Sequence, residues 1–229
     1  APYNTGFLGA VYLSALVPLS ILLWARRWSP ARLILPMLWM FVMQLLVMSF
    51  LYSEVFDFQR RATGLWFGLY LADTLVATYY LGRFWTRSAP NAQRAFGWSK
   101  LLSVQALVFG FYGVGLLLLP ATFSGFWPWQ LDAFHGRLYS AIFTSGAVGC
   151  GLLARAATTL ELRALGGLQV ALGGLVVAAL LLVDARLHKV DWSALGTWIW
   201  LVLFLGLAAL GVATIAIARQ SLSNHSGAT

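Results

Sequence analysis

The sequence predicts an all-α membrane protein that crosses the bilayer seven times. Of its 229 residues, 60% are hydrophobic and only 10% are charged, which leaves too few polar residues to cover the surface of a water-soluble domain. Seven apolar stretches are each close to the roughly 20 residues that a helix needs to cross the hydrocarbon core. None of them alternates between polar and apolar residues as a barrel strand does, so helices are the elements that fit.

The seven predicted spans follow one another with short connections, and only the third contains a charged residue. In chain order they are 7–24, which ends before Arg26; 33–53, which follows Arg32; 62–82, which follows Arg61; 101–119, which follows Lys100; 138–154, between Arg137 and Arg155; 164–183, which follows Arg163; and 194–218, which ends before Arg219.

The distribution of charge predicts the orientation of these spans. With the amino terminus outside and the carboxyl terminus in the cytoplasm, ten of the 15 Lys and Arg residues lie on the cytoplasmic side, as the positive-inside rule requires. The net charge of +8 therefore reflects topology and does not indicate a nucleic-acid partner. The basic loop that starts at residue 83 is expected to lie against anionic lipid headgroups.

An internal repeat predicts how the spans are organised. Residues 56–71, FDFQRRATGLWFGLYL, align without gaps to residues 190–205, VDWSALGTWIWLVLFL. The informative identities are Asp57 with Asp191, Thr63 with Thr197, and Trp66 with Trp200. We expect a 3+1+3 arrangement of parallel repeats, divided into a first three-helix repeat (1–82), a basic loop and linking helix (83–131), a second three-helix repeat (132–219) and a polar cytoplasmic tail (220–229).

Three segments resemble a group of bacterial multi-span membrane proteins that have a Trp-Pro-Trp elbow and an internal helix repeat. The segments are FLGAVYLSA near the start, FWPWQLDAFHGRLYSA in the middle and VDWSALGTWIW near the end. The resemblance implies a multi-pass protein of the bacterial inner (plasma) membrane and no known activity. In the elbow, residues 125–137, the tryptophans fit an interfacial aromatic belt, and Asp132 is expected near the start of the next helix.

Asp73 is the one acidic residue inside a predicted span. A charge near the middle of the bilayer costs roughly 3 kcal/mol on insertion scales, so such a residue is a functional candidate. Neighbouring polar side chains could hydrogen-bond to it or line a path; they are Gln44, Thr74, Thr78 and Tyr80. Two readings remain open, namely a protonated acid that ties two helices together and a transport or proton-transfer site.

A second polar cluster is predicted on the outer side of the membrane. It contains Asp132, His135, Asp184, His188 and Asp191. Such side chains can bind metals, but their spacing matches no metal motif, and acids at helix starts also accept backbone N–H groups. No metal site is therefore predicted, and the cluster is kept as a minor candidate for an outer-face site.

Glycine pairs in the sixth span predict close helix packing. Gly166, Gly167, Gly173 and Gly174 lie seven residues apart as pairs, so this face is expected to pack against another helix of the bundle or of a partner subunit.

The sequence contains no recognised catalytic motif. It has no phosphate-binding loop, no serine elbow and no pair of histidines for zinc or heme, so the chain is more consistent with a protein that is not an enzyme. No cofactor is predicted, although bound lipid is compatible with the composition. The first functional hypothesis is a scaffold or accessory subunit of a larger membrane complex. The alternative is a small-solute or proton-coupled secondary transporter that uses Asp73 at the midplane between repeats.

Overall fold

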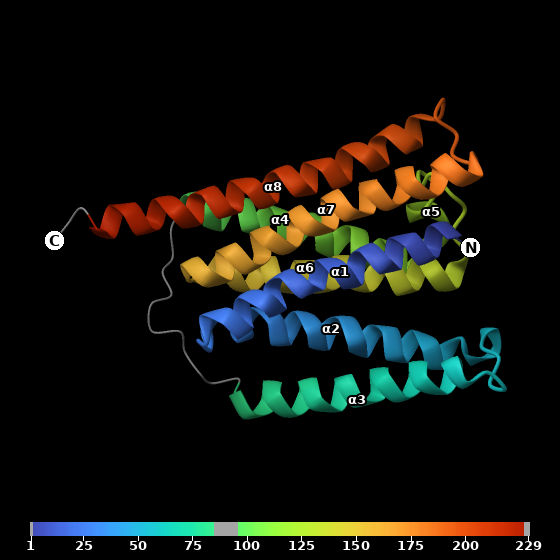
Figure 1. Ribbon diagram of the computed structural model, residues 1–229, viewed down its shortest axis with the longest axis horizontal. Coiled ribbons are helices and arrows are strands. Elements are labelled where there is room, and N and C mark those ends of the chain that lie inside the picture. Colours follow the sequence, from blue (N-terminus) through green and yellow to red (C-terminus); the bar gives the residue numbers. More distant parts are fainter. Residues whose placement is uncertain (1, 85–95, 227–229) are drawn as a thin grey trace.

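The computed structural model describes residues 2–84 and 96–226, and most of the predicted basic loop lies outside them. The described residues form an all-α bundle, as predicted (Figure 1). Its helices are α1 (Pro2–Ala25), α2 (Ser29–Leu51), α3 (Arg61–Phe84), α4 (Phe96–Leu118), the short α5 (Pro120–Phe123), α6 (Ala133–Arg155), α7 (Thr159–Leu187) and α8 (Leu195–Ser226), with a 3-10 turn η1 (Ser53–Val55) after α2.

Five helices in the described part of the chain are long and apolar enough to cross a membrane, as expected of a multi-pass membrane protein. They are α1, α2, α7, residues Trp98–Leu118 of α4, and residues Leu195–Arg219 of α8. The helices α3 and α6 are as long as these but carry more polar residues. The two differ in position, because much of α6 is buried inside the bundle whereas most of α3 is exposed.

The long helices lie along one common axis, and successive long helices run in opposite directions (Figure 1). The most closely packed pairs are α4 with α6, α7 with α8, α1 with α7, α2 with α6, and α2 with α3. Figure 1 places α3 at one edge, beside α2, and puts the start of α1 and the end of α8 at opposite ends of the bundle. We call the end that holds the start of α1 and the elbow the elbow end.

The two aligned segments fold alike before α3 and α8. The Thr63 hydroxyl donates to the Asp57 carbonyl oxygen at 2.7 Å, and the Thr197 hydroxyl donates to the Asp191 carbonyl oxygen at 2.8 Å. Each aspartate carboxylate also accepts the backbone N–H two residues later. The acid thus orders the turn that precedes the helix, and the buried threonine ties the first helical residues to that turn.

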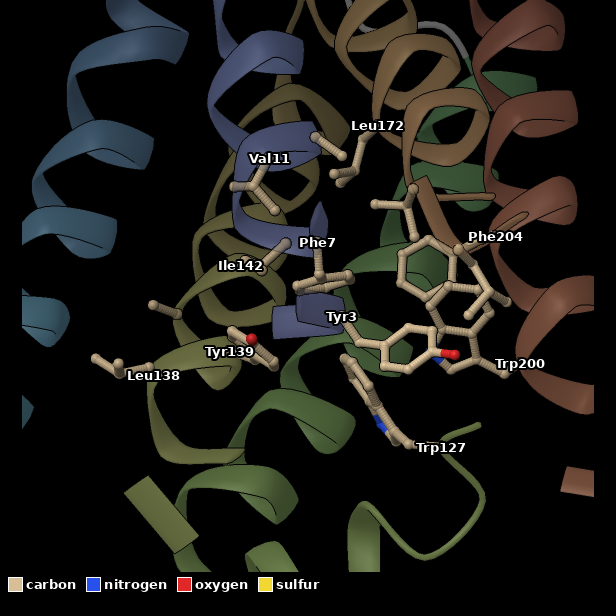
Figure 2. Close-up of a cluster of buried hydrophobic side chains, with 14 of the residues drawn as sticks. Tyr3, Phe7, Val11, Trp127, Leu138, Tyr139, Ile142, Leu172, Trp200 and Phe204 are labelled. Atoms are coloured by element: carbon tan, nitrogen blue, oxygen red, sulfur yellow. The ribbon is translucent and has the colours of Figure 1, made fainter. Parts of the chain in front are cut away.

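The elbow is held in a core of aromatic side chains at the elbow end (Figure 2). Trp127 stacks on Tyr139 of α6 with ring centroids 5.5 Å apart and donates to the Tyr112 hydroxyl at 2.8 Å. The Trp129 indole donates to the Asn4 side chain at 2.8 Å. Trp127 is only 7% exposed, because it packs inside this core, and the position of the tryptophans at the membrane interface stays a prediction.

Candidate functional site

Asp73 lies near the middle of α3 with its side chain on the exposed side of that helix. Within the described residues, it forms no hydrogen bond and no ion pair. Its carboxylate interacts electrostatically with the hydroxyl groups of Tyr12 and Tyr70, which hydrogen-bond to each other between α1 and α3. Asp73 is therefore at the edge of a small polar patch that opens away from the bundle.

Gln44 belongs to a different part of the protein. Its side-chain amide is buried between α2 and α6, where it donates to the Ser140 hydroxyl and accepts from the Thr144 hydroxyl at 2.7 Å. These bonds join two packed helices at a buried position, where an unpaired amide would be costly. The structure does not bring Gln44 and Asp73 together.

The other three residues predicted beside Asp73 also have separate surroundings. Thr78 accepts a hydrogen bond from the Trp39 indole at 2.9 Å and donates to the Thr74 carbonyl oxygen at 2.7 Å. The Thr74 hydroxyl is buried and has no partner among the described residues. Tyr80 is exposed and stacks on Phe84. Thr78 thus links α3 to α2, and none of the three hydrogen-bonds to the Asp73 carboxylate.

Small residues line the exposed side of α3 next to Asp73. Gly64, Gly68 and Ala72 are all exposed and follow one another at intervals of four residues. A methyl group added at Gly64 or Gly68 would meet no atom within 4 Å. Leu65, Leu69 and Asp73 each follow one of these small residues and are exposed as well. We call these six residues the α3 face.

The five residues predicted on the outer side do not converge on one point. Within the described parts of the chain, no three His, Cys, Asp or Glu side chains are close enough to hold a metal ion. Asp132 caps the start of α6 by accepting the backbone N–H of His135 at 2.8 Å, which confirms its predicted place at a helix start. His188 is the left-handed residue that ends α7, and Asp191 orders the turn before α8.

Asp184 is a buried structural residue. Its carboxylate accepts from the Tyr3 hydroxyl and the Trp192 indole, each at 2.8 Å, and from the backbone N–H groups of Lys189 and Val190. These four bonds occupy both carboxylate oxygens, so they fasten the α7–α8 connection to the start of α1 and leave little capacity to bind a ligand.

Hydrogen bonds keep two of these acids ionised. Partial burial acts to raise the pKa of Asp132, but hydrogen bonds from the backbone and ring of His135 outweigh it and lower that pKa below its usual value. The pKa of Asp191 is lowered by hydrogen bonds from the hydroxyl and then the backbone N–H of Ser193. Both groups therefore carry a negative charge at neutral pH.

A buried ion pair at the other end of the bundle was not singled out from the sequence. The Arg32 guanidinium donates to both carboxylate oxygens of Glu161, at 2.7 and 2.8 Å, and to the Ala156 carbonyl oxygen at 2.7 Å. Glu161 also accepts from the Thr158 backbone and completes a capping box at the start of α7. The sequence TTLE contains the Thr-x-x-Glu signal for this box, whereas its pairing with Arg32 depends on tertiary contact.

A second buried polar group was also missed. The Gln169 side chain of α7 donates to the Gln105 side-chain oxygen of α4 at 2.9 Å, and the Cys150 thiol of α6 lies 3.5 Å from the same oxygen. One amide nitrogen and one amide oxygen of this pair have no partner among the described residues. The single bond joins α4 to α7 beside α6.

The glycine pairs of α7 lie mostly against helices of the same chain. Methyl groups added at Gly166 and Gly173 would approach backbone oxygens of α8 to 2.7 and 2.3 Å, and one at Gly167 would approach Val17 of α1 to 2.8 Å. Only Gly174 faces open space. The predicted close packing is confirmed as packing within the bundle, and three of the four glycines leave no room for a partner helix.

No family model, curated protein or solved structure matches the chain in the comparisons made.

Proposed function

We propose that this protein is a non-catalytic scaffold or accessory subunit of a larger complex in a bacterial inner membrane. In the proposed topology, α3 and α6 also cross the bilayer, which gives seven spans in a 3+1+3 plan with the amino terminus outside. The repeated Asp-Thr turns before α3 and α8 support the repeat. In this plan α1 and α2 begin the first repeat, and α6 and α7 begin the second. The first helix of each repeat packs on the second helix of the other, α1 on α7 and α6 on α2, which supports an axis that relates the two halves.

One observation carries the functional proposal, namely the exposed acid in the middle of α3. A carboxylate that faced lipid at this depth would cost roughly 3 kcal/mol. Polar residues of a membrane helix usually face the bundle interior or pair with a neighbour, whereas Asp73 is exposed and, among the described residues, has only its electrostatic contact with the Tyr12 and Tyr70 hydroxyls. A partner subunit that covers α3 would remove that cost, so the exposed acid is best explained as part of an interface.

The alternative of a secondary transporter has less support. A carrier of this plan would use Asp73 between the two repeats, with Gln44 at a similar depth. Asp73 instead is exposed beside the Tyr12–Tyr70 pair, and the Gln44 amide is engaged with Ser140 and Thr144. A carrier would still require that Asp73→Asn abolish uptake of a solute while the protein stays folded.

Gentle extraction from native membranes tests the proposal. We expect the 229-residue chain to leave the membrane together with at least one other membrane protein in a fixed ratio, as measured by native mass spectrometry. The proposal would be abandoned if extraction into lipid nanodiscs, without detergent, gave only the single chain with bound lipid.

A further inference from the structure

We infer that the α3 face binds a membrane-spanning helix of a different protein, and that this helix carries a lysine, arginine or histidine near its midpoint. The inference rests on the proposed role as a subunit, and it adds the location of the interface and the chemistry of the partner.

The α3 face has the shape that close helix packing requires. Gly64, Gly68 and Ala72 form a row of small exposed residues along the helix, and Leu65, Leu69 and Asp73 follow them as a row of larger exposed residues. Small residues at four-residue spacing let two helix backbones approach closely, commonly in a right-handed crossing of about −40°. The side of α3 that carries the buried residues Thr63, Tyr70, Thr74 and Ala77 is already used, because it faces the rest of the bundle.

Charge complementarity selects the partner's side chain. The nearest basic residues on α3 are Arg61 and Arg83, at its two ends, and they lie about 18 and 15 Å from Asp73 along the axis at 1.5 Å per residue. No other described basic residue forms an ion pair with Asp73. The described residues therefore supply no cation to this carboxylate, and we assign that role to a partner, in which Lys, Arg and His are the side chains that can fill it.

The same argument disfavours a second copy of this protein. Two copies joined symmetrically through parallel α3 faces would place Asp73 opposite Asp73 and Arg61 near Arg61. Neither pair of like charges is stabilised by such an arrangement. A different chain with a central cation would bind the carboxylate and would leave the outer arginines apart.

The repeat provides an internal comparison. Leu207 of α8 corresponds to Asp73 when the alignment is continued by two residues, and it is buried in the hydrophobic core. The chain thus has leucine where this position packs against its own helices and an acid where the position is exposed. This is the reverse of what contact with lipid would favour, and it is the pattern expected if the acid meets a polar group of a partner.

The test uses the full chain in lipid nanodiscs and a synthetic transmembrane helix of leucine and alanine with one central lysine. Binding is measured by energy transfer between fluorophores on the two molecules, and helices with a central leucine or glutamate serve as reference probes. We expect the lysine helix to bind about tenfold more tightly than the leucine helix, which corresponds to about 1.4 kcal/mol. Asp73→Asn should reduce this preference to near unity.

The row of small residues on the α3 face is tested with Gly68→Ile, which should weaken binding of the lysine helix by about tenfold. The matched control is Gly206→Ile on α8, where an added side chain also starts in open space, and it should leave binding unchanged. Thermal unfolding of each variant verifies folding, and Gly64→Ala provides a milder change on the same face if Gly68→Ile is unstable.

Three results would overturn the inference. The first is equal affinity of the wild-type protein for the lysine and leucine helices. The second is self-association of labelled copies that Gly68→Ile abolishes, which would identify a second copy as the occupant. The third is a native complex whose composition is unchanged by both Asp73→Asn and Gly68→Ile. In that last case the proposed subunit role would stand while this interface would be rejected.

Discussion

Arg32 and Glu161 form an ion pair whose carboxylate is completely buried. The pair links α2 to the start of α7, and Glu161 also caps α7, so one side chain serves both the contact between helices and the local structure. A buried ion pair contributes little net stability compared with well-packed apolar residues, but the loss of one partner leaves an uncompensated charge.

Glu161→Gln should therefore lower the free energy of unfolding by about 3 kcal/mol, because it leaves the Arg32 guanidinium partly buried without its counter-charge. The matched control is Glu54→Gln, since Glu54 is exposed in η1 and should change stability by less than about 0.5 kcal/mol. Reversible unfolding in mixed micelles measures both values. Equal effects of the two variants would contradict the structural role of the pair.

Asp132 makes stability at the start of α6 depend on pH. Its pKa is lower in the folded protein than the usual 3.8, so the carboxylate stabilises the fold above the unfolded-state pKa and loses that effect as the pH falls through the folded-state pKa. Asp132→Asn should be less stable than wild type at neutral pH, and the difference should shrink as the pH falls below 3.8 and disappear below the lower folded-state pKa. Thermal unfolding of both proteins in one detergent across this range provides the measurement. A difference that grew on acidification would refute this explanation.

At the scale of helices, the contact between α7 and α8 depends on glycine. A methyl group at Gly173 would lie 2.3 Å from the Phe204 carbonyl oxygen, a backbone atom that can move only if the helices separate. The neighbouring Gly174 is exposed and has no atom within 4 Å of such a methyl group. The two adjacent glycines therefore have opposite roles in packing.

Gly173→Ala should destabilise the protein by about 2 kcal/mol through forced separation of α7 and α8. Gly174→Ala should be neutral or stabilising by up to about 1 kcal/mol, because alanine favours the helix and meets no obstacle. Unfolding in mixed micelles compares the two variants directly. Similar behaviour of both would mean that α7 and α8 are not packed as closely as described.

The helices α3 and α6 have related compositions but different surroundings. Polar residues of α6 such as Ser140 and Thr144 hydrogen-bond inside the bundle, whereas Asp73 of α3 is exposed. Local sequence cannot separate these cases, since hydropathy reports how polar a helix is and not which of its sides is covered.

At the scale of the whole molecule, the proposed topology places the two ends of α3 on opposite sides of the membrane. Cys150 is completely buried, so the native chain should react slowly with a membrane-impermeant maleimide and give little background labelling. The exposed residues Gln59, before α3, and Arg83, near its end, are suitable positions for new cysteines.

Gln59→Cys should be labelled in intact cells, and Arg83→Cys should be labelled only after the membrane is permeabilised. The positive-inside distribution of Lys and Arg is the physical reason for this direction. Labelling of both positions from the same side would show that α3 does not cross the bilayer, and the reverse order would show that the orientation is inverted.

The sequence by itself determined the helical class and the multi-pass character, because apolar segments of about 20 residues have one stable form in a bilayer. It also located Asp132 at a helix start and the glycine pairs at a close contact, since capping and backbone approach depend on local chemistry. The tertiary structure decided which polar groups meet. It paired Arg32 with Glu161 and Gln44 with Ser140, buried Trp127 in the aromatic core, and left Asp73 exposed. Those outcomes depend on how helices that are distant in sequence pack together, and the local sequence around a residue does not determine which helix covers it.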